Sequence, residues 1–348
     1  MAVTIYDIAE RARVSIATVS RVFNDHPRVS EDTRRRVFDV AEQLGYEPHA
    51  SARSLARQNT QLISAVVPMM TSYFFMEVLR GLQDRLDESA YDLLVYASRT
   101  LDKVDGPLAR AIQRGRADGL LLVSTPLDDE RAARLQAARR PVVLVDSFHP
   151  DFDSVSVDNR KGGCEATRHL IQLGHERIGL LLPNLESVPA AERYAGYQDA
   201  LREAGIPLDE HLVHASDDRV QHGYARWAGY QAMQRLLACP DRPRAVFAAA
   251  DVLALGALRA VREAGLRVPE DVALVGFDDI ATSAYVGLTT LRQPMYEMGK
   301  LAIEKLLRRL ADPDMPPSHT IFAPRLVVRD SSGAPVELLS TDGMDVRF

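Results

Sequence analysis

The chain has 348 residues, of which 46% are hydrophobic and 26% charged, and its formal net charge at pH 7 is −6. This length exceeds what one hydrophobic core normally organises, so more than one packing unit is expected. We find no secretory leader pattern and no apolar run near the length of about 18 residues that spans a membrane, and we expect a soluble cytoplasmic protein. Cys164 and Cys239 are too far apart to indicate a disulfide framework or a zinc site.

The negative net charge hides an uneven distribution. Residues 1–60 contain nine Arg against eight acidic residues, whereas the rest of the chain has 33 basic and 40 acidic residues. Binding to nucleic acid requires clustered basic side chains that neutralise phosphates. The N-terminal segment is therefore the candidate for contact with DNA.

Three short amphipathic helices are predicted within residues 1–46. Thr4 followed by Asp7 fits a capping box that opens a helix over residues 5–12, Ser15 can cap a second over 16–24, and Ser30 a third over 31–44. The turn between the first two helices is short, which is typical of a helix-turn-helix. The predicted shared core consists of Ala9, Val14, Val19 and Phe23.

Residues 47–60 contain few large apolar side chains and are interpreted as a hinge or linker. The segment over residues 50–56 nevertheless has good helix propensity and can fold as a short hinge helix once a partner supplies packing.

From residue 61 onward, short runs rich in Val, Leu and Ile alternate with helical patterns. Near-continuous apolar strands of this kind predict parallel sheets covered by helices on both faces. The number of units predicts two doubly wound halves, and ligands bind such sheets at the carboxyl ends of the strands. The runs begin at Gln61, Tyr91, Ala117, Pro141, Arg177, Arg244 and Asp271.

Catalytic motifs are missing from the sequence. No GxGxxG follows a strand, and neither a P-loop nor a GxSxG motif occurs, so dinucleotide-binding, nucleotide-hydrolysing and hydrolase classes are not supported. His211 and His214 lie in a strand-like segment that would point them to opposite sides, which argues against a metal site. We expect no enzyme, no cofactor and no metal.

Longer stretches of the amino-acid sequence resemble the LacI/GalR family of bacterial repressors. The segment VSIATVSRVFN is followed by LGY and SLA, and later by HLIQLGHERIGLL, ERYAGYQDALREAGI and LRVPEDVALVGFDD. The resemblance implies a DNA-binding domain over residues 1–46 and a fold like that of periplasmic sugar-binding proteins over 61–330. The N-terminal subdomain would take about 61–160 and 293–322, and the C-terminal one 161–291 and 323–330, leaving a tail over 331–348.

The resemblance also assigns DNA contacts. It puts Ile16, Ala17 and Arg21 at positions that read base edges. It also implies that Leu55, beside Arg53, inserts as an apolar wedge into the minor groove. An Arg can donate two hydrogen bonds to guanine, and an apolar wedge kinks the duplex. A phosphate contact for Arg21 and packing of Leu55 on its own domain are the alternatives. The residues placed near phosphates are Thr4, Ser15, Thr18, Asn24 and Ser30.

Candidate effector-binding residues lie after the predicted strands. Carboxylates and an Arg bind hydroxyls, and aromatic faces pack on a sugar ring or a base. The family places its effector-binding Arg and Asp at Arg193 and Asp278. Asp251 is an equally good candidate for capping the helix that follows it. The other candidates are Phe74, Phe75, Asp146 and Tyr224.

These observations favour a repressor that binds a pseudo-palindromic DNA operator as a homodimer. A dimer is expected because the tail has no leucine heptad of the kind that forms a tetramer in some family members. A sugar is the favoured effector. A purine is the alternative, but the loop over residues 186–189 lacks the basic stretch of purine-responsive relatives. A solute-binding protein of the same fold would not need residues 1–60. Whether the effector releases DNA or promotes DNA binding stays open.

Overall fold

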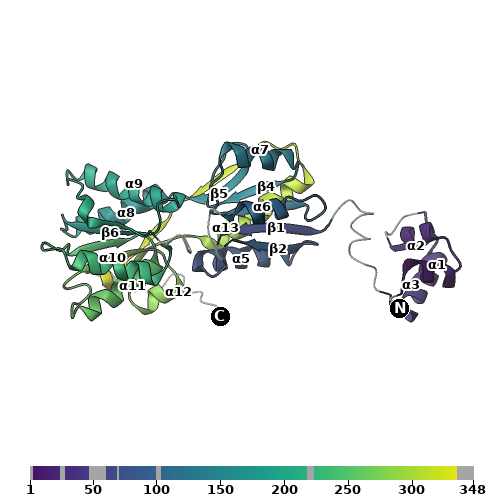
Figure 1. The fold of residues 1–348 in the computed structure, drawn as a ribbon, viewed down its shortest axis with the longest axis horizontal. Helices are drawn as coiled ribbons and strands as arrows, with labels where there is room; N and C mark the ends of the chain where they lie inside the picture. Colours follow the sequence, from purple (N-terminus) through teal and green to yellow (C-terminus); the bar gives the residue numbers. More distant parts are fainter. Residues whose placement is uncertain are drawn as a thin grey trace.

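The computed structural model describes residues 3–23, 28–46, 60–68, 70–98, 103–217 and 223–334. In these ranges the chain forms a small helical module followed by two α/β lobes (Figure 1). No helix among the described residues is long and apolar enough to cross a membrane. Asn24, Arg53 and Leu55 lie outside the described residues.

The module consists of α1 (Ile5–Arg11), α2 (Ile16–Phe23) and α3 (Glu31–Gln43) around one apolar core. The Asp7 carboxylate accepts hydrogen bonds from the amide and the hydroxyl of Thr4, each at 2.7 Å. Ser15 Oγ accepts from the Thr18 amide at 3.1 Å, and Ser30 Oγ from the Thr33 amide at 3.4 Å. The capping residues predicted from the sequence therefore do open these helices.

The module core is larger than the sequence pattern predicted. Ile8, Val19, Val22 and Val37 are at most 1% exposed, whereas Val14 and Phe23 are only partly buried at its edge. Arg13 adopts a left-handed conformation with φ of 52° in the turn between α1 and α2. This tight turn lets α2 cross α1 directly.

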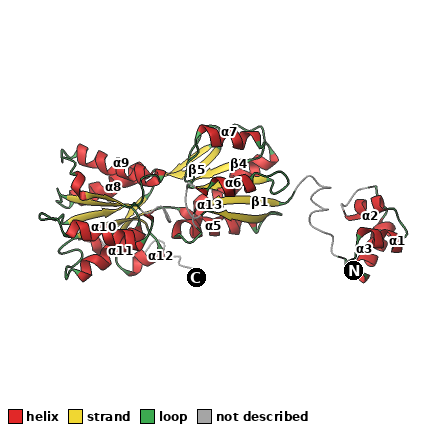
Figure 2. Cartoon of the chain, in the orientation of Figure 1, coloured by secondary structure: helices red, strands yellow, loops and turns green. Residues whose placement is uncertain are grey.

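The first lobe is built on a parallel sheet with strand order β11-β5-β4-β3-β1-β2. Helices cover both faces (Figure 2). Ile63, Ala65 and Val67 of β1 pack in the core that α5 and α13 cover, while Val66 belongs to the core under α6 and α7. The elements are β1 (Leu62–Val67), α5 (Tyr73–Leu86), β2 (Asp92–Ala97), α6 (Asp105–Ala111), β3 (Gly119–Val123), α7 (Asp129–Ala137), β4 (Val142–Val145), β5 (Asp153–Val157), α13 (Met295–Ala311) and β11 (His319–Phe322).

The second lobe has a sheet with strand order β12-β10-β9-β8-β6-β7, covered by α10 and α11 on one face and by α8 and α9 on the other. All its strand pairs are parallel except β10 with β12, which is an antiparallel pair at the edge of the sheet, so the predicted parallel sheet is confirmed with one antiparallel edge strand. The elements are α8 (Asn159–Gln172), β6 (Ile178–Leu182), α9 (Val188–Glu203), η2 (Glu210–Leu212), β7 (Val213–Ala215), α10 (Arg226–Leu237), β8 (Ala245–Ala248), α11 (Asp251–Glu263), β9 (Ala273–Asp278), α12 (Ala281–Tyr285), β10 (Thr289–Arg292), β12 (Arg325–Val327) and η4 (Asp330–Ser332).

The chain crosses between the lobes three times, after β5, after β10 and after β11. The second lobe also extends beyond residue 330, where the sequence placed the start of the tail. Ser331 and Ser332 are at most 3% exposed, and Ser331 Oγ donates a hydrogen bond of 2.6 Å to the Leu274 carbonyl. The last part of the chain that the structure describes is therefore packed against β9.

Candidate DNA-binding face and effector cavity

The solvent-facing side of α2, together with Ser15 just before the helix, presents a surface of mixed chemistry. Ser15, Ile16, Ala17 and Arg21 are exposed, and Ile16 keeps 42% of its surface accessible, while Val19 on the opposite side is fully buried. The Ser15 and Thr18 hydroxyls lie 2.9 Å apart. One face of α2 therefore anchors the helix, and the other offers the apolar side chains of Ile16 and Ala17 and the guanidinium of Arg21.

Arg21 projects from this face without an acidic partner within 4 Å in the part of the chain that the structure describes. Thr4 and Ser30 are also exposed, at the N-terminal ends of α1 and α3. Both hydroxyls already take part in helix capping, because Thr4 Oγ1 donates to Asp7 and Ser30 Oγ accepts from the Thr33 amide, and their contact with phosphate stays a prediction.

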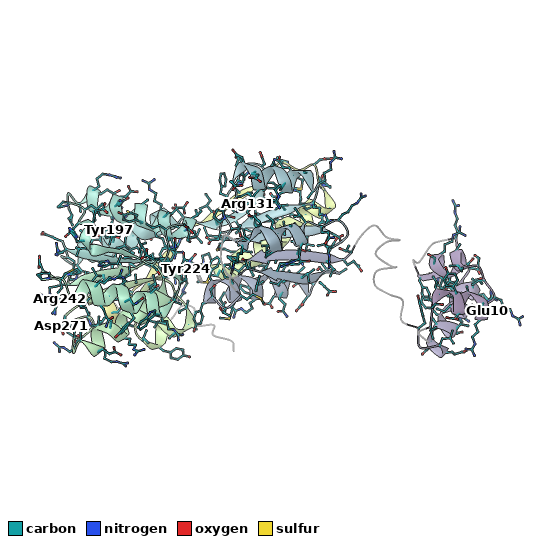
Figure 3. The ribbon with its side chains drawn as sticks, viewed as in Figure 1. Glu10, Arg131, Tyr197, Tyr224, Arg242 and Asp271 are labelled. Carbon is teal, nitrogen blue, oxygen red and sulfur yellow. The ribbon has the colours of Figure 1, made fainter. Side chains whose placement is uncertain are left out.

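A cavity of about 340 Å³ lies between the carboxyl ends of the two sheets. Phe74, Asp146, Arg193, Tyr224 and Asp278 line it, together with Phe75 at its base, so residues predicted from both halves of the sequence meet there. Figure 3 labels Tyr224 on the side of the second lobe that faces the first. Phe75 is 2% exposed and forms part of the first lobe's core, with its ring edge-on to Phe74 at 5.5 Å.

Arg193 is held rigidly on α9. Its Nε donates to Asn159 Oδ1 at 2.9 Å, its Nη1 donates to the Ala249 carbonyl at 2.6 Å, and its guanidinium stacks 3.7 Å from the centroid of the Phe277 ring. Helices α8 and α9 can pack closely because Gly163 has no side chain. A Cβ at this position would lie 2.3 Å from the Arg193 carbonyl oxygen. Arg193 is thus a fixed cation that is only 3% exposed.

Asp146 follows β4 with a positive φ of 54°, a conformation that costs energy outside glycine and directs its carboxylate toward the cavity. Its Oδ2 accepts from Ser124 Oγ at 2.7 Å, while Oδ1 is buried without a hydrogen-bond partner among the described residues. Burial raises the pKa of Asp146 to about 6, opposed by the Ser124 hydrogen bond and the charge of Arg193. Asp146 Oδ1 is therefore an unsatisfied buried acceptor in a residue that lines the cavity.

Asp278 ends β9 with φ of 126° and lies 3.6 Å from Nη1 of Arg193. Gln293 Nε2 donates to Asp278 Oδ1 at 2.5 Å, which leaves Gln293 Oε1 buried without a partner in the described chain. Burial raises the pKa of Asp278, and the Arg193 charge opposes this shift. The neighbouring Asp279 instead forms ion pairs with Arg292 and Arg329, so only the first carboxylate of the FDD sequence lines the cavity.

The structure corrects the assignment of Asp251 as an effector contact. The side chain is 0% exposed and does not line the cavity. Its oxygens accept hydrogen bonds from Ile280 N at 3.0 Å, Ser283 Oγ at 2.6 Å and Thr290 Oγ1 at 2.6 Å. It makes no capping bond either, because Ala250 is the N-cap of α11. Burial raises the pKa of Asp251, and the negative charge of Asp278 adds to that shift.

Several cavity residues were missed by the sequence argument. Ser124 and Gln293 follow strands that end at the cavity, and Ser187 bonds to the Tyr224 hydroxyl at 3.1 Å. Tyr73 at the start of α5 and Arg226 at the start of α10 complete the wall from opposite lobes. The rule that ligands lie at strand ends could have identified Ser124. His211 and His214 lie in η2 and β7, and no group of three or more metal-ligating residues occurs in the described ranges.

Comparisons with known proteins match both parts of this architecture. A model of the lacI family of bacterial regulatory proteins matches residues 4–49, and a model of a periplasmic binding protein-like domain matches residues 167–332. The regulator RegA of Clostridium saccharobutylicum is 34% identical over 95% of this chain and 100% of its own length. The repressor PurR of Escherichia coli O139:H28 is 36% identical over 94% of this chain and 96% of its own.

Solved structures of regulators also superpose on this chain. The Lac repressor dimer bound to operator and the anti-inducer ONPF has a TM-score of 0.80 at 29% identity, covering 95% of this chain and 99% of that one. The complex of the transcriptional regulator CelR with cellobiose has a TM-score of 0.69 at 32% identity, covering 94% and 99%. With a helix-turn-helix module, two doubly wound lobes and relatives that match over almost its whole length, this chain belongs to the LacI family of bacterial transcription regulators.

Proposed function

We propose that the protein represses transcription by binding a pseudo-palindromic operator as a homodimer, and that a small molecule in the cavity controls its affinity for DNA. The observation that carries this proposal is that both lobes line one cavity, with Asp146 from the first and Arg193 from the second. A ligand held by both lobes favours one relative arrangement of them, and an effector acts only through such a difference in affinity between states.

The DNA contacts are proposed from the exposed face of α2. Arg21 would donate to a base edge in the major groove, and Ile16 and Ala17 would contact a thymine methyl group or a sugar. Thr4, Ser15, Thr18 and Ser30 would bind phosphates, and we extend the same role to Asn24. Leu55, beside Arg53, would act as the minor-groove wedge between the half-sites.

We infer that the effector is a sugar or sugar derivative. Asp146 and Gln293 line the cavity, and each has one buried acceptor oxygen without a hydrogen-bond partner in the described chain, which suits hydroxyl donors; Phe74 offers an apolar wall for a ring. The volume of about 340 Å³ suits a compact ligand. Among similar proteins, CelR was solved with cellobiose, and a regulator from Enterococcus faecium that is 29% identical was solved with ribose.

A purine is the second candidate, favoured by the 36% identity to PurR and by the aromatic Tyr73, Phe74 and Tyr224. Against it, the loop over Glu186, Ser187 and Pro189 offers no basic side chain to a base edge. The cavity contains no motif for catalysis, and we infer a binding site and not an active site. The DNA module also distinguishes the chain from a solute-binding protein.

Two measurements test the proposal. Fluorescence anisotropy with the gene's own upstream region, at about 50 and 200 mM salt, should detect sequence-dependent binding that weakens steeply with salt. A thermal-shift panel of sugars, sugar phosphates and nucleobases should identify ligands, which are then added to the DNA titration. If the protein shows no sequence-dependent DNA binding, either alone or with any stabilising ligand, the proposal that it is a transcription regulator is rejected. If only hypoxanthine or guanine stabilises the protein, the proposal of a sugar effector is rejected.

A further inference from the structure

Arg226 is a cation of the cavity wall whose charge no carboxylate in the described part of the chain neutralises. It is the first residue of α10, it lines the cavity, and it is exposed. Within the described ranges no carboxylate lies within 4 Å of its guanidinium, and its one hydrogen bond runs from Nη2 to the Tyr73 hydroxyl at 3.4 Å. A neutral acceptor at that distance leaves the positive charge of Arg226 available to a ligand.

Arg193 differs from Arg226 in each of these respects. Arg193 is 3% exposed, bonds to Asn159 and Ala249, and lies 3.6 Å from the Asp278 carboxylate. Arg193 already balances the charge of Asp278, so the exposed Arg226 is not needed for that purpose. Arg226 therefore indicates a separate subsite near solvent.

Backbone groups add to the positive potential beside Arg226. The N-cap of α10 is Ala225, which also lines the cavity and has no side chain that can accept from the first-turn amides. The first-turn amides and the dipole of an uncapped helix favour a negative group at this position.

The deep end of the cavity has the opposite chemistry. Asp146 is 7% exposed and Gln293 5% exposed, and each has one oxygen without a hydrogen-bond partner in the described chain. Both residues line the cavity, so a bound molecule can supply the missing donors. Hydroxyl groups meet this requirement, whereas a second anion beside Asp146 would be repelled.

We propose that the effector has two ends: a hydroxyl-bearing body at Asp146 and Gln293, and one phosphate or carboxylate group bound by Arg226 and the N-terminus of α10. This inference rests on the proposed function and narrows the effector to a sugar phosphate or a sugar acid. Phosphate and carboxylate share the chemistry that Arg recognises, namely paired acceptor oxygens with negative charge. The cavity of about 340 Å³ limits the body to a small sugar.

The test captures ligands directly from a mixture of metabolites. Immobilised full-length wild-type protein, its Arg226→Gln variant and a matrix without protein are incubated with a polar metabolite extract of bacterial cells. Retained compounds are released by denaturation and identified by mass spectrometry. The Arg235→Gln variant is the matched control, because Arg235 is exposed on the same helix but does not line the cavity.

We expect one anionic, hydroxyl-rich compound on the wild type and on Arg235→Gln. The amount retained on Arg226→Gln should be lower by about tenfold or more, as for the loss of a charged hydrogen bond. Treating the extract with alkaline phosphatase separates the two sources, because only a phosphate ester disappears. Retention of a neutral compound, or equal retention of an anion by Arg226→Gln, would overturn the inference and leave the regulator intact. If no compound is retained above the level of the matrix without protein, both the proposed effector control and the inference of an anionic effector fail.

Discussion

The DNA-binding face and the effector cavity differ in how the chain builds them. Ser15, Ile16, Ala17 and Arg21 are neighbours in sequence, exposed, and supported by a small core under one helix. The cavity instead joins residues from 68 to 293, and its key groups Asp146, Arg193 and Asp278 are all at least nine-tenths buried. A surface of the first kind tolerates substitution with little effect on folding, whereas a site of the second kind ties binding to stability.

The largest expected effect follows from Arg193→Ala. The change leaves Asp278 buried without its cation and removes the contacts to Asn159, so we expect a loss of about 3–5 kcal/mol in the free energy of unfolding. Effector binding should disappear, while the module should still bind DNA below the lowered melting temperature. Thermal unfolding and anisotropy measure both.

Arg202→Ala is the control on the same helix. Arg202 is 71% exposed in its ion pair with Asp199, so its removal should change stability by less than about 1 kcal/mol. Equal losses for the two variants would contradict the distinction between a buried and an exposed cation.

The second prediction concerns Asp146 and pH. The pKa of Asp146 is about 6 in the folded protein against 3.8 in the absence of the fold, so the folded state binds more protons between these values. Its ionisation therefore destabilises the protein above pH 6, and this penalty declines as the pH falls through 6 toward 4. Asp146→Asn should stabilise the protein by about 2 kcal/mol at pH 7, with a smaller gain at pH 5, and should weaken effector binding.

Asp153→Asn should have the opposite sign. Burial tends to raise the pKa of Asp153, but the hydrogen bonds from Ser318 and Arg309 outweigh it and lower that pKa. The stability that the carboxylate contributes is therefore present at pH 7 and is lost as the pH falls through its folded pKa. Denaturant titrations at pH 5 and 7 compare the two variants. A destabilised Asp146→Asn variant at pH 7 would show that its buried charge is fully compensated.

Arg21→Ala tests the exposed surface. We expect a loss of about 1–3 kcal/mol in discrimination between operator and mutated operator for each half-site, with unchanged thermal stability and effector binding. Anisotropy with specific and scrambled duplexes gives the ratio. Equal weakening for both duplexes would assign Arg21 to a phosphate instead of a base.

The smallest effect is expected for the cap of α3. Ser30→Ala removes the acceptor for the Thr33 amide and should cost about 1 kcal/mol in module stability, whereas Ser30→Gly should cost only a few tenths. Chemical denaturation measures both variants. If Ser30 also binds phosphate, both should weaken DNA binding alike, which separates its two roles.

Local sequence was sufficient to predict many of the helices, strands and exposed side chains of this protein. The caps at Thr4, Ser15 and Ser30, the strand runs and the exposed face of α2 follow from spacing and side-chain chemistry, because helices and buried strands depend on near neighbours. The prediction of two doubly wound halves is confirmed. Arg193 and Asp278, which the family resemblance assigns to effector binding, both line the cavity, and their role there stays a prediction.

Only the tertiary structure decided which of several similar residues face the cavity. Asp251 and Asp278 both lie at the ends of neighbouring strands, yet Ile280, Ser283 and Thr290 surround Asp251 with donors, whereas Asp278 faces Arg193 and open space. Gln293 and Arg226 reach the cavity because the chain crosses between lobes after β10 and because α10 begins at its wall. Such positions depend on packing between distant segments, which no local pattern of residues records.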